Sequence, residues 1–373
     1  MTGTDSMIHI PARTRVSVAT ASDRTEAITR ALDSVRDDLR AKVRGRVMVK
    51  PNFLSSTHGL SSTHAGAVAA VLGFLVDTDA ESVVVAEGGS RSTEQAFDNF
   101  GYRTVLDRYG AGTLDLNHVP HPLSFETITA RGGTQTVQYA DIRSMADTVI
   151  SVPVAKTHDS GALTLSIKNM MGCLRRVHRP RMHGVVIGDG VSRAAELLWN
   201  AVEVHPLVIK SFSGAVFTLV NGIRARDSRR GASSQASSPP AGLVRQIGAM
   251  AENIACMAAV LMPDIAVIDA FEAMEGDGPG SAGTRVSLGA AVAGTDPVAC
   301  DAVMAHLMGF DPMDIGYLRL LHERGLGVAD LGKIDIVGDD PDAVARGFRP
   351  HRNHASQLRW REGLEAITTV KRQ

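Results

Sequence analysis

Lysines at the ends of apolar runs are the residues of this sequence best suited to chemistry. Only seven of the 39 basic Lys and Arg residues are lysines, and two of them, Lys156 and Lys168, lie in the stretch SVPVAKTHDSGALTLSIKNMMG. Burial or a nearby cation can bring the pKa of a lysine toward neutrality, so a lysine can act as base, acid or nucleophile. Lys156 and Lys168, with His158 between them, are therefore the candidate catalytic residues.

Three predicted strands, over residues 46–50, 82–86 and 149–155, are each followed by a polar or glycine-rich segment. In open parallel sheets, ligands bind beyond the carboxyl ends of the strands, so these segments should share one crevice. The turn after the second of these strands has two interpretations: a site that holds a phosphate or carboxylate through free N–H groups, or a tight connection between a strand and a helix. The candidate residues for binding an anionic substrate are Lys50, Asn52, Glu87, Gly88, Gly89, Ser90, Asn169 and Arg175, with Glu275 and Gly278 from the glycine-rich stretch EGDGPGSAG.

Metal binding has less support in the sequence than anion binding. The candidate ligands are His58, His64, His158 and His183, and their spacings are not the i, i+4 pairs of zinc-binding helices. Cys173, Cys256 and Cys300 lie far apart, which predicts reduced thiols and excludes a clustered iron–sulfur site. We expect Cys173 to be a buried, inert thiol; a nucleophilic role would need a cation such as Arg175 to stabilise the thiolate.

Composition argues against several classes of partner. The net charge is −1 and aromatic residues make up 4% of the chain, so neither nucleic acid nor an anionic membrane is an expected partner. No apolar run reaches the length of about 18 residues that a membrane span needs, and no secretory leader is recognisable. We expect a cytoplasmic protein with a small-molecule substrate, and the many small residues on its helices are compatible with a homodimer.

Alternating apolar strands and amphipathic helices predict an α/β fold with mostly parallel sheets. We expect two α/β domains with a cleft between them, over residues 10–205 and 244–345, joined by a flexible connection over 206–243. A C-terminal tail over 346–373 is free to pack back on the first domain. The predicted helix caps are Ser22, Ser62 or Thr63, and Ser92 with Gln95 three residues later, and Pro297 starts a further helix.

Four blocks of this sequence resemble the family catalogued as domain of unknown function 362. They are VKPN, YADIRSMADTVISVPVAKTHDSGALTLSIKNMMG, VIDAFEAMEGDGPGSAG and GTDPVACDAVMAHLMG, and the resemblance runs from roughly Lys50 to Gly338. Many members of that family carry a ferredoxin-like pair of cysteine-rich cluster motifs. This chain lacks those cysteines, so it departs from such members.

The layout of the sequence is also similar, more distantly, to that of the nickel-dependent lactate racemase family. In that family a strand-end segment with a histidine is followed by a glycine-rich stretch whose lysine carries a nickel-pincer nucleotide. The resemblance implies Lys168 as the corresponding lysine and His158 as a site histidine. It is one of layout, and we leave the cofactor unassigned.

Three functions are consistent with these residues. The first is an enzyme that acts on a small anionic metabolite by lysine and histidine acid–base chemistry, through isomerisation, elimination or cyclisation, in a specialised biosynthetic pathway. The second is a metal- or cofactor-dependent redox protein that works with a separate ferredoxin. The third is a protein that binds a ligand without catalysis. The lyase or isomerase type of enzyme is the expectation carried forward.

Overall fold

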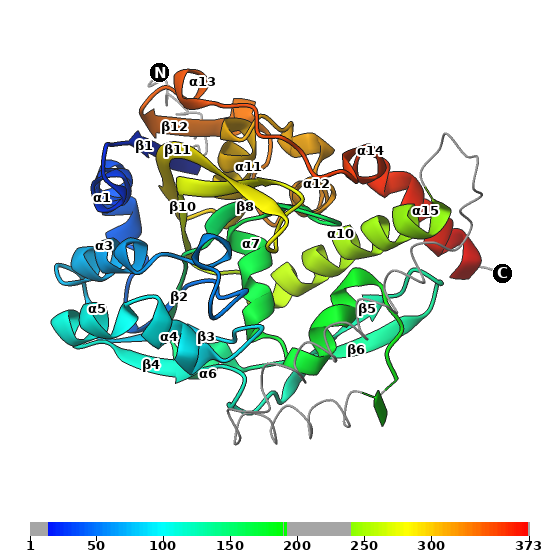
Figure 1. Cartoon of the computed structure of the whole chain (residues 1–373), viewed down its shortest axis with the longest axis horizontal. Coiled ribbons are helices and arrows are strands. Elements are labelled where there is room, and N and C mark those ends of the chain that lie inside the picture. Colours follow the sequence, from blue (N-terminus) through cyan, green and yellow to red (C-terminus); the bar gives the residue numbers. More distant parts are fainter. Residues whose placement is uncertain (1–13, 189, 192–239, 372–373) are drawn as a thin grey trace, which may run out of the picture.

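A single large sheet organises the chain (Figure 1). The computed structural model describes residues 14–188, 190–191 and 240–371. Ten strands form the sheet, eight of them in the order β12-β1-β11-β10-β7-β2-β3-β4, with β8 paired to β10 and β9 to β8. The predicted α/β class with a mostly parallel sheet is confirmed.

The elements have the following bounds. The strands of the large sheet are β1 (Thr14–Thr20), β2 (Gly45–Lys50), β3 (Ala80–Glu87), β4 (Gly112–Asp115), β7 (Thr148–Ser151), β8 (Val154–His158), β9 (Ala162–Thr164), β10 (Ile265–Gly276), β11 (Gly283–Gly294) and β12 (Ile334–Gly338), and a separate pair is β5 (Leu123–Ile128) with β6 (Thr134–Tyr139). The α-helices are α1 (Arg24–Ser34), α2 (Arg36–Arg40), α3 (Ala65–Leu75), α4 (Thr93–Asn99), α5 (Tyr102–Tyr109), α6 (Ile142–Met145), α7 (Ser166–Asn169), α10 (Ala241–Leu261), α11 (Pro297–Leu307), α12 (Gly316–Glu323), α13 (Pro341–Val344), α14 (His354–Gln357) and α15 (Trp360–Lys371). Short 3₁₀ helices include η1 (Gly59–Ser61), η2 (Met170–Cys173) and η3 (Arg176–His183).

The two halves of the sequence share this sheet, which corrects the expectation of two separate sheets. Strand β11 pairs antiparallel with β1 on one side and with β10 on the other, and β10 pairs in parallel with β7. Strands β10 and β11, from the second predicted domain, lie between β1 and β7 of the first. The candidate residues therefore do not lie in a cleft between two separate sheets. Most of the expected connection over 206–243 lies outside the described residues, and the domain boundaries stay predictions.

Apolar side chains cover both faces of the sheet. One buried cluster joins α1, α3, α4 and α5 to residues such as Val47, Val49 and Val85, and another joins α7, α10, α11 and α12 to residues such as Met48. Successive strand residues point to opposite faces, so Val47 and Met48 belong to different clusters. A strand buried on both faces needs a nearly continuous apolar run, which explains the composition of RVMV.

The helix starts follow the sequence signals in part. The Ser92 side chain accepts a hydrogen bond from the Gln95 N–H, and α11 begins at Pro297, as predicted. Two predicted caps are wrong by one residue or more: Asp23 caps α1 in place of Ser22, and the His64 ring caps α3 in place of Ser62 or Thr63. In both helices the residue one position further along the chain has a side-chain hydrogen-bond acceptor, and that residue is the N-cap.

A break in the predicted strand over 149–155 changes the position of the catalytic candidates. Strand β7 ends at Ser151, and β8 begins at Val154 after Pro153. Proline has no N–H to donate to a ladder, so it interrupts the strand. Lys156 and His158 therefore lie within β8, not after a strand end as expected. Their backbone is fixed by pairing with β9.

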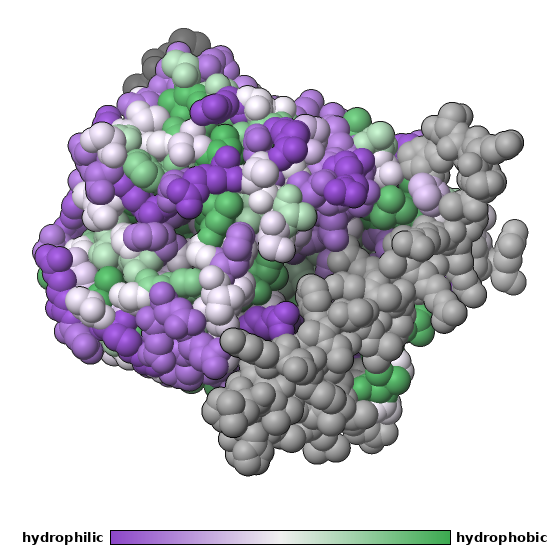
Figure 2. Space-filling model, in the orientation of Figure 1, coloured by the Kyte–Doolittle hydropathy of each residue, from purple (hydrophilic) through white to green (hydrophobic). Residues whose placement is uncertain are grey.

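The outer surface carries polar residues, with apolar residues in separate patches on the face that Figure 2 shows. Among the helices that the structure describes, none has both the length and the apolar character of a membrane span.

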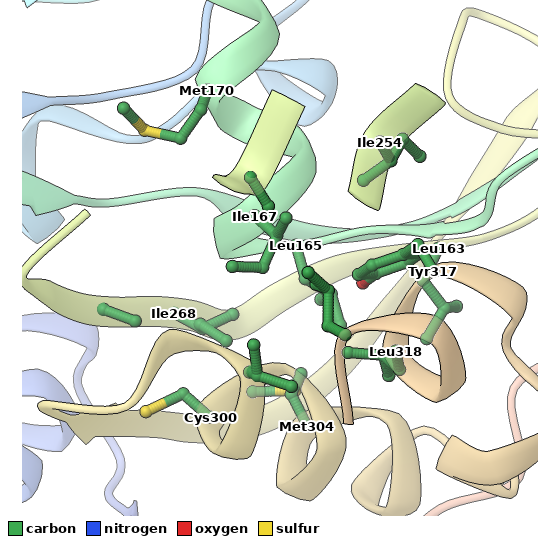
Figure 3. Close-up of a cluster of buried hydrophobic side chains, with 14 of the residues drawn as sticks. Leu163, Leu165, Ile167, Met170, Ile254, Ile268, Cys300, Met304, Tyr317 and Leu318 are labelled. Atoms are coloured by element: carbon green, nitrogen blue, oxygen red, sulfur yellow. The ribbon is translucent and has the colours of Figure 1, made fainter. Parts of the chain in front are cut away.

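A buried aspartate fixes the short helix α7 against the second half of the chain. Asp301 of α11 accepts hydrogen bonds from the N–H groups of Ser166 (2.7 Å) and Ile167 (3.1 Å) and from the Tyr317 hydroxyl (3.0 Å). Figure 3 shows Leu165 and Ile167, at this helix, among apolar side chains of α10, α11 and α12. Because α7 carries Lys168 and Asn169, Asp301 helps to set their position.

Replacing this aspartate should therefore weaken the fold. Asp301→Ala leaves three buried donors without their acceptor, so the free energy of unfolding should fall by about 3 kcal/mol. Chemical denaturation measures this change. Asp311→Ala, which removes an exposed cap of a short 3₁₀ helix, is the control and should cost about 1 kcal/mol or less. Equal losses in the two variants would contradict the anchoring role.

Candidate functional site

Lys50 and Glu87 form a buried ion pair at the carboxyl edge of the sheet. They are the last residues of neighbouring parallel strands, β2 and β3, and both are inaccessible to solvent. The Lys50 ammonium also donates to the Pro51 carbonyl (3.2 Å) and to Asn169 Oδ1 (3.3 Å). An ammonium has three N–H donors, and Lys50 has an acceptor for each of them. Lys50 therefore has a full set of hydrogen-bond partners.

Helix α7 and the turn after it close over this ion pair. The Asn169 amide donates to the Lys50 carbonyl and to Ser151 Oγ, both at 3.0 Å, which ties α7 to the ends of β2 and β7. A Cβ at Gly172 would lie 2.6 Å from Lys50 Nζ and 2.8 Å from Glu87 Oε2. Such distances are shorter than real Cβ contacts, so this position requires glycine.

Lys156 is fully buried and has a different set of partners. Its Nζ donates to Asn52 Oδ1 and to the Ser61 carbonyl (2.7 Å), and among the described residues these neutral oxygens are its acceptors. Burial, with a contribution from the charges of Lys168 and Lys50, lowers the pKa of Lys156 to about 7, against the opposing effect of Glu87. A lysine in this environment exchanges a proton near neutral pH.

Lys168 and His158 lie close to each other on either side of Gly161. A Cβ at Gly161 would lie 3.4 Å from Lys168 Cε and 3.6 Å from His158 Nδ1. The charge of Lys168 also acts on Lys156, so the three catalytic candidates belong to one neighbourhood. We call Lys50, Glu87, Lys156 and Lys168 the lysine cluster.

The imidazole of His158 is oriented by its own turn. Its Nδ1 accepts the N–H groups of Ser160 and Gly161, both at 3.1 Å. With that lone pair in use, the 3.0 Å contact between Nδ1 and Asp159 is not a charged pair, and the ring proton sits on Nε2. The ring stacks on His183 at a centroid distance of 5.8 Å. His158 can therefore take part in proton transfer only through Nε2.

Two of the three backbone N–H groups in the turn over Gly88–Ser90 have acceptors within the protein. The Gly89 N–H donates to Thr93 Oγ1 (3.0 Å), and the Ser90 N–H donates to the Phe53 carbonyl (3.1 Å). Anion binding at this turn stays a prediction. Arg179 donates to the Gly89 carbonyl at 3.2 Å.

The remaining candidates for substrate binding are held by other contacts. The Arg175 guanidinium donates to the Gln138 side chain of β6. Glu275 accepts the Arg349 N–H at 2.9 Å, and a Cβ at Gly278 would lie 2.5 Å from the Thr157 carbonyl. The glycine-rich stretch thus forms the turn between β10 and β11 and lies against β8.

The C-terminal segment contacts the first segment of the chain next to the candidate site. The Gln357 side chain donates to the His158 carbonyl (2.6 Å), and the Asn353 side chain donates to the Asp159 carbonyl (3.0 Å). Helix α15 packs on α10, as Figure 1 shows. This segment therefore fixes the turn between β8 and β9, from which His158 and Gly161 reach the lysine cluster.

The residues considered for metal binding and thiol chemistry do not gather into one site. His64 accepts the Gly66 N–H as a helix cap, and burial together with Arg24 lowers the pKa of its ring. Within the described ranges, no group of three His, Cys, Asp or Glu residues could hold a metal ion. Burial raises the pKa of the Cys173 thiol to about 11, which disfavours a thiolate nucleophile.

Several residues that shape the site left little signal in the sequence. Ser61 contributes only a carbonyl group, which any residue type could supply. Arg179 stood among other arginines of the segment 175–181. Asp301 gave the clearest signal of the three, because an aspartate in an otherwise apolar helix is buried and needs hydrogen-bond donors.

Comparison with known proteins identifies a family. A family model described as "Domain of unknown function (DUF362)" matches residues 47–306, which is most of the chain. The match includes the whole lysine cluster and Asp301. A comparison with curated proteins finds no match.

A methyl group at Gly172 should disturb the buried ion pair. Gly172→Ala places a Cβ against Lys50 and Glu87, so the free energy of unfolding should fall by about 2 kcal/mol. Gly59→Ala is the control, because nothing lies within 4 Å of the Cβ at that position. Thermal and chemical denaturation measure both variants. A Gly172 variant as stable as the Gly59 variant would contradict the close packing.

The lowered pKa of Lys156 makes stability depend on pH. The folded chain releases the Lys156 proton near pH 7 and the unfolded chain near pH 10.5, so the unfolded state binds more protons between these values. Stability of the wild type relative to Lys156→Met should therefore rise by about 2 kcal/mol from pH 7 to pH 9. Denaturation curves at both pH values test this, with the exposed Lys333→Met as control. If the stability difference between the wild type and Lys156→Met is the same at pH 7 and pH 9, the pKa of Lys156 is not lowered in the folded chain.

Proposed function

This chain belongs to the domain of unknown function 362 family, and we propose that its lysine cluster binds and transforms a small anionic metabolite. In this proposal Lys156 moves a proton next to the carboxylate or phosphate of the substrate. The observation that carries the proposal is the state of Lys156: a fully buried amine with a pKa of about 7 among other lysines.

The charges around Lys156 support an anionic substrate. Glu87 is the carboxylate paired with Lys50, whereas the acceptors of Lys156 within the described residues are neutral. Burying a cationic amine without a counter-ion is unfavourable, so an anion bound nearby would be stabilised. The anion would in turn favour the protonated form of Lys156, which couples binding to proton uptake.

The pKa of Lys156 supports acid–base catalysis. A group whose pKa is close to the working pH is present in both forms and can both accept and return a proton. Lys168, and His158 through Nε2, would stabilise the negative charge that develops when a proton leaves a carbon next to a carboxylate. Isomerisation, elimination and cyclisation all include such a step, so the proposed enzyme is of the lyase or isomerase type.

A comparison of metabolites tests the proposed function. A strain that lacks this protein should accumulate the substrate, and a wild-type copy should restore the parental profile. Lys156→Met should fail to restore it, because the proton acceptor is lost, whereas the exposed Lys333→Met should restore it fully. Circular dichroism of both purified variants checks that they are folded. Full restoration by a folded Lys156→Met protein would contradict catalysis and favour a protein that only binds its ligand.

A further inference from the structure

The two buried lysines Lys50 and Lys156 differ in the number and charge of their acceptors. Lys50 has three acceptors, one of them a carboxylate, which is the full set for an ammonium. Lys156 has two, Asn52 Oδ1 and the Ser61 carbonyl, among the described residues. A neutral amine has two N–H groups and one lone pair, so these two acceptors satisfy its donors and leave the lone pair unused.

We propose that the amine of Lys156 is a nucleophile that condenses with a carbonyl group of the substrate. The substrate class is then a small oxo acid, in which a ketone or aldehyde carbon lies next to a carboxylate. This inference rests on the proposed function in one respect, because the same lysine cluster would hold the carboxylate. It goes beyond that function by assigning a covalent intermediate.

The reaction is a condensation that needs no further reactant. The Lys156 lone pair attacks the carbonyl carbon, and the carbonyl oxygen takes up a proton to give a carbinolamine. Loss of that oxygen as water leaves an imine between Nζ and the substrate carbon. The protonated imine withdraws electrons from the neighbouring carbon, which eases loss of a proton from that carbon. Addition of water reverses the sequence and releases the free lysine.

The neighbouring cations support both requirements of this chemistry. A nearby ammonium favours the neutral and therefore nucleophilic form of a buried lysine. Lys168 and Lys50 act on Lys156 in this direction. Lys168 also lies against Gly161, beside the turn that orients His158, where it can face a carboxylate bonded to the carbonyl carbon. The substrate would thus bind with its carbonyl toward Lys156 and its carboxylate toward Lys168.

Both acceptors of Lys156 belong to one connection. Asn52 and Ser61 both belong to the segment between β2 and α3, and the residues between them include exposed positions such as Thr57 and Gly59. A displacement of this segment would remove both acceptors of Lys156 together.

Reductive trapping tests this proposal on the full-length protein. The protein is incubated with glyoxylate and sodium cyanoborohydride at pH 7.5, and the modified lysines are quantified by peptide mass spectrometry. Lys156 should react at least tenfold faster than the exposed Lys42 and Lys333, because an ordinary lysine is neutral in only about one molecule in a thousand at this pH. Lys168→Met should slow the reaction of Lys156 with glyoxylate at least fivefold more than its reaction with uncharged acetaldehyde. Loss of the Lys168 charge raises the pKa of Lys156 and slows both reactions, whereas loss of a partner for the carboxylate affects glyoxylate alone.

The outcomes separate this inference from the proposed function. If Lys156 reacts no faster than Lys42 and Lys333, the nucleophile is refuted, and the acid–base function still stands wherever Lys156→Met fails in the metabolite comparison. If Lys156 is trapped selectively, the nucleophile is supported, even where Lys156→Met restores the metabolite profile and the proposed function fails. Equal trapping with glyoxylate and acetaldehyde in all variants would overturn the assignment to oxo acids.

Discussion

The burial of several lysines at one edge of a sheet is the constraint on which this structure depends. An isolated buried ammonium is unfavourable, and the chain meets this cost in two ways. Lys50 pairs with Glu87 and donates to two further acceptors. Lys156 has neutral partners and gives up its proton more easily, with a pKa of about 7. One edge therefore holds a lysine with a carboxylate partner and a lysine with neutral partners.

The surrounding fold serves to keep these groups at their positions. Asp301 fixes α7 from the later half of the sequence, and α7 supplies Asn169, which ties the ends of β2 and β7 together. The C-terminal segment reaches the end of β8, where Gln357 holds the backbone of His158. A site made of residues from distant parts of the chain is thus assembled by a single sheet and two buried polar anchors.

The sequence predicted the edge of the sheet better than the chemistry of individual residues. Lys50 and Glu87 were correctly expected at neighbouring strand ends, because an apolar run followed by polar residues marks the end of a strand. The break at Pro153 and the position of β11 between β1 and β10 were missed, since strand order depends on tertiary packing. The different states of Lys50 and Lys156 could not be predicted, because a carboxylate from one strand and a carbonyl from a loop decide them.

The pKa of Lys156 is the quantity that tests this account most directly. With seven lysines in the chain, lysine labelled with ¹³C and ¹⁵N gives few side-chain signals, and their chemical shifts can be followed from pH 5 to pH 11 by NMR. The account predicts one lysine that titrates near pH 7 and whose signal disappears in Lys156→Met. Titration of every lysine above about pH 10, as in model peptides, would contradict it.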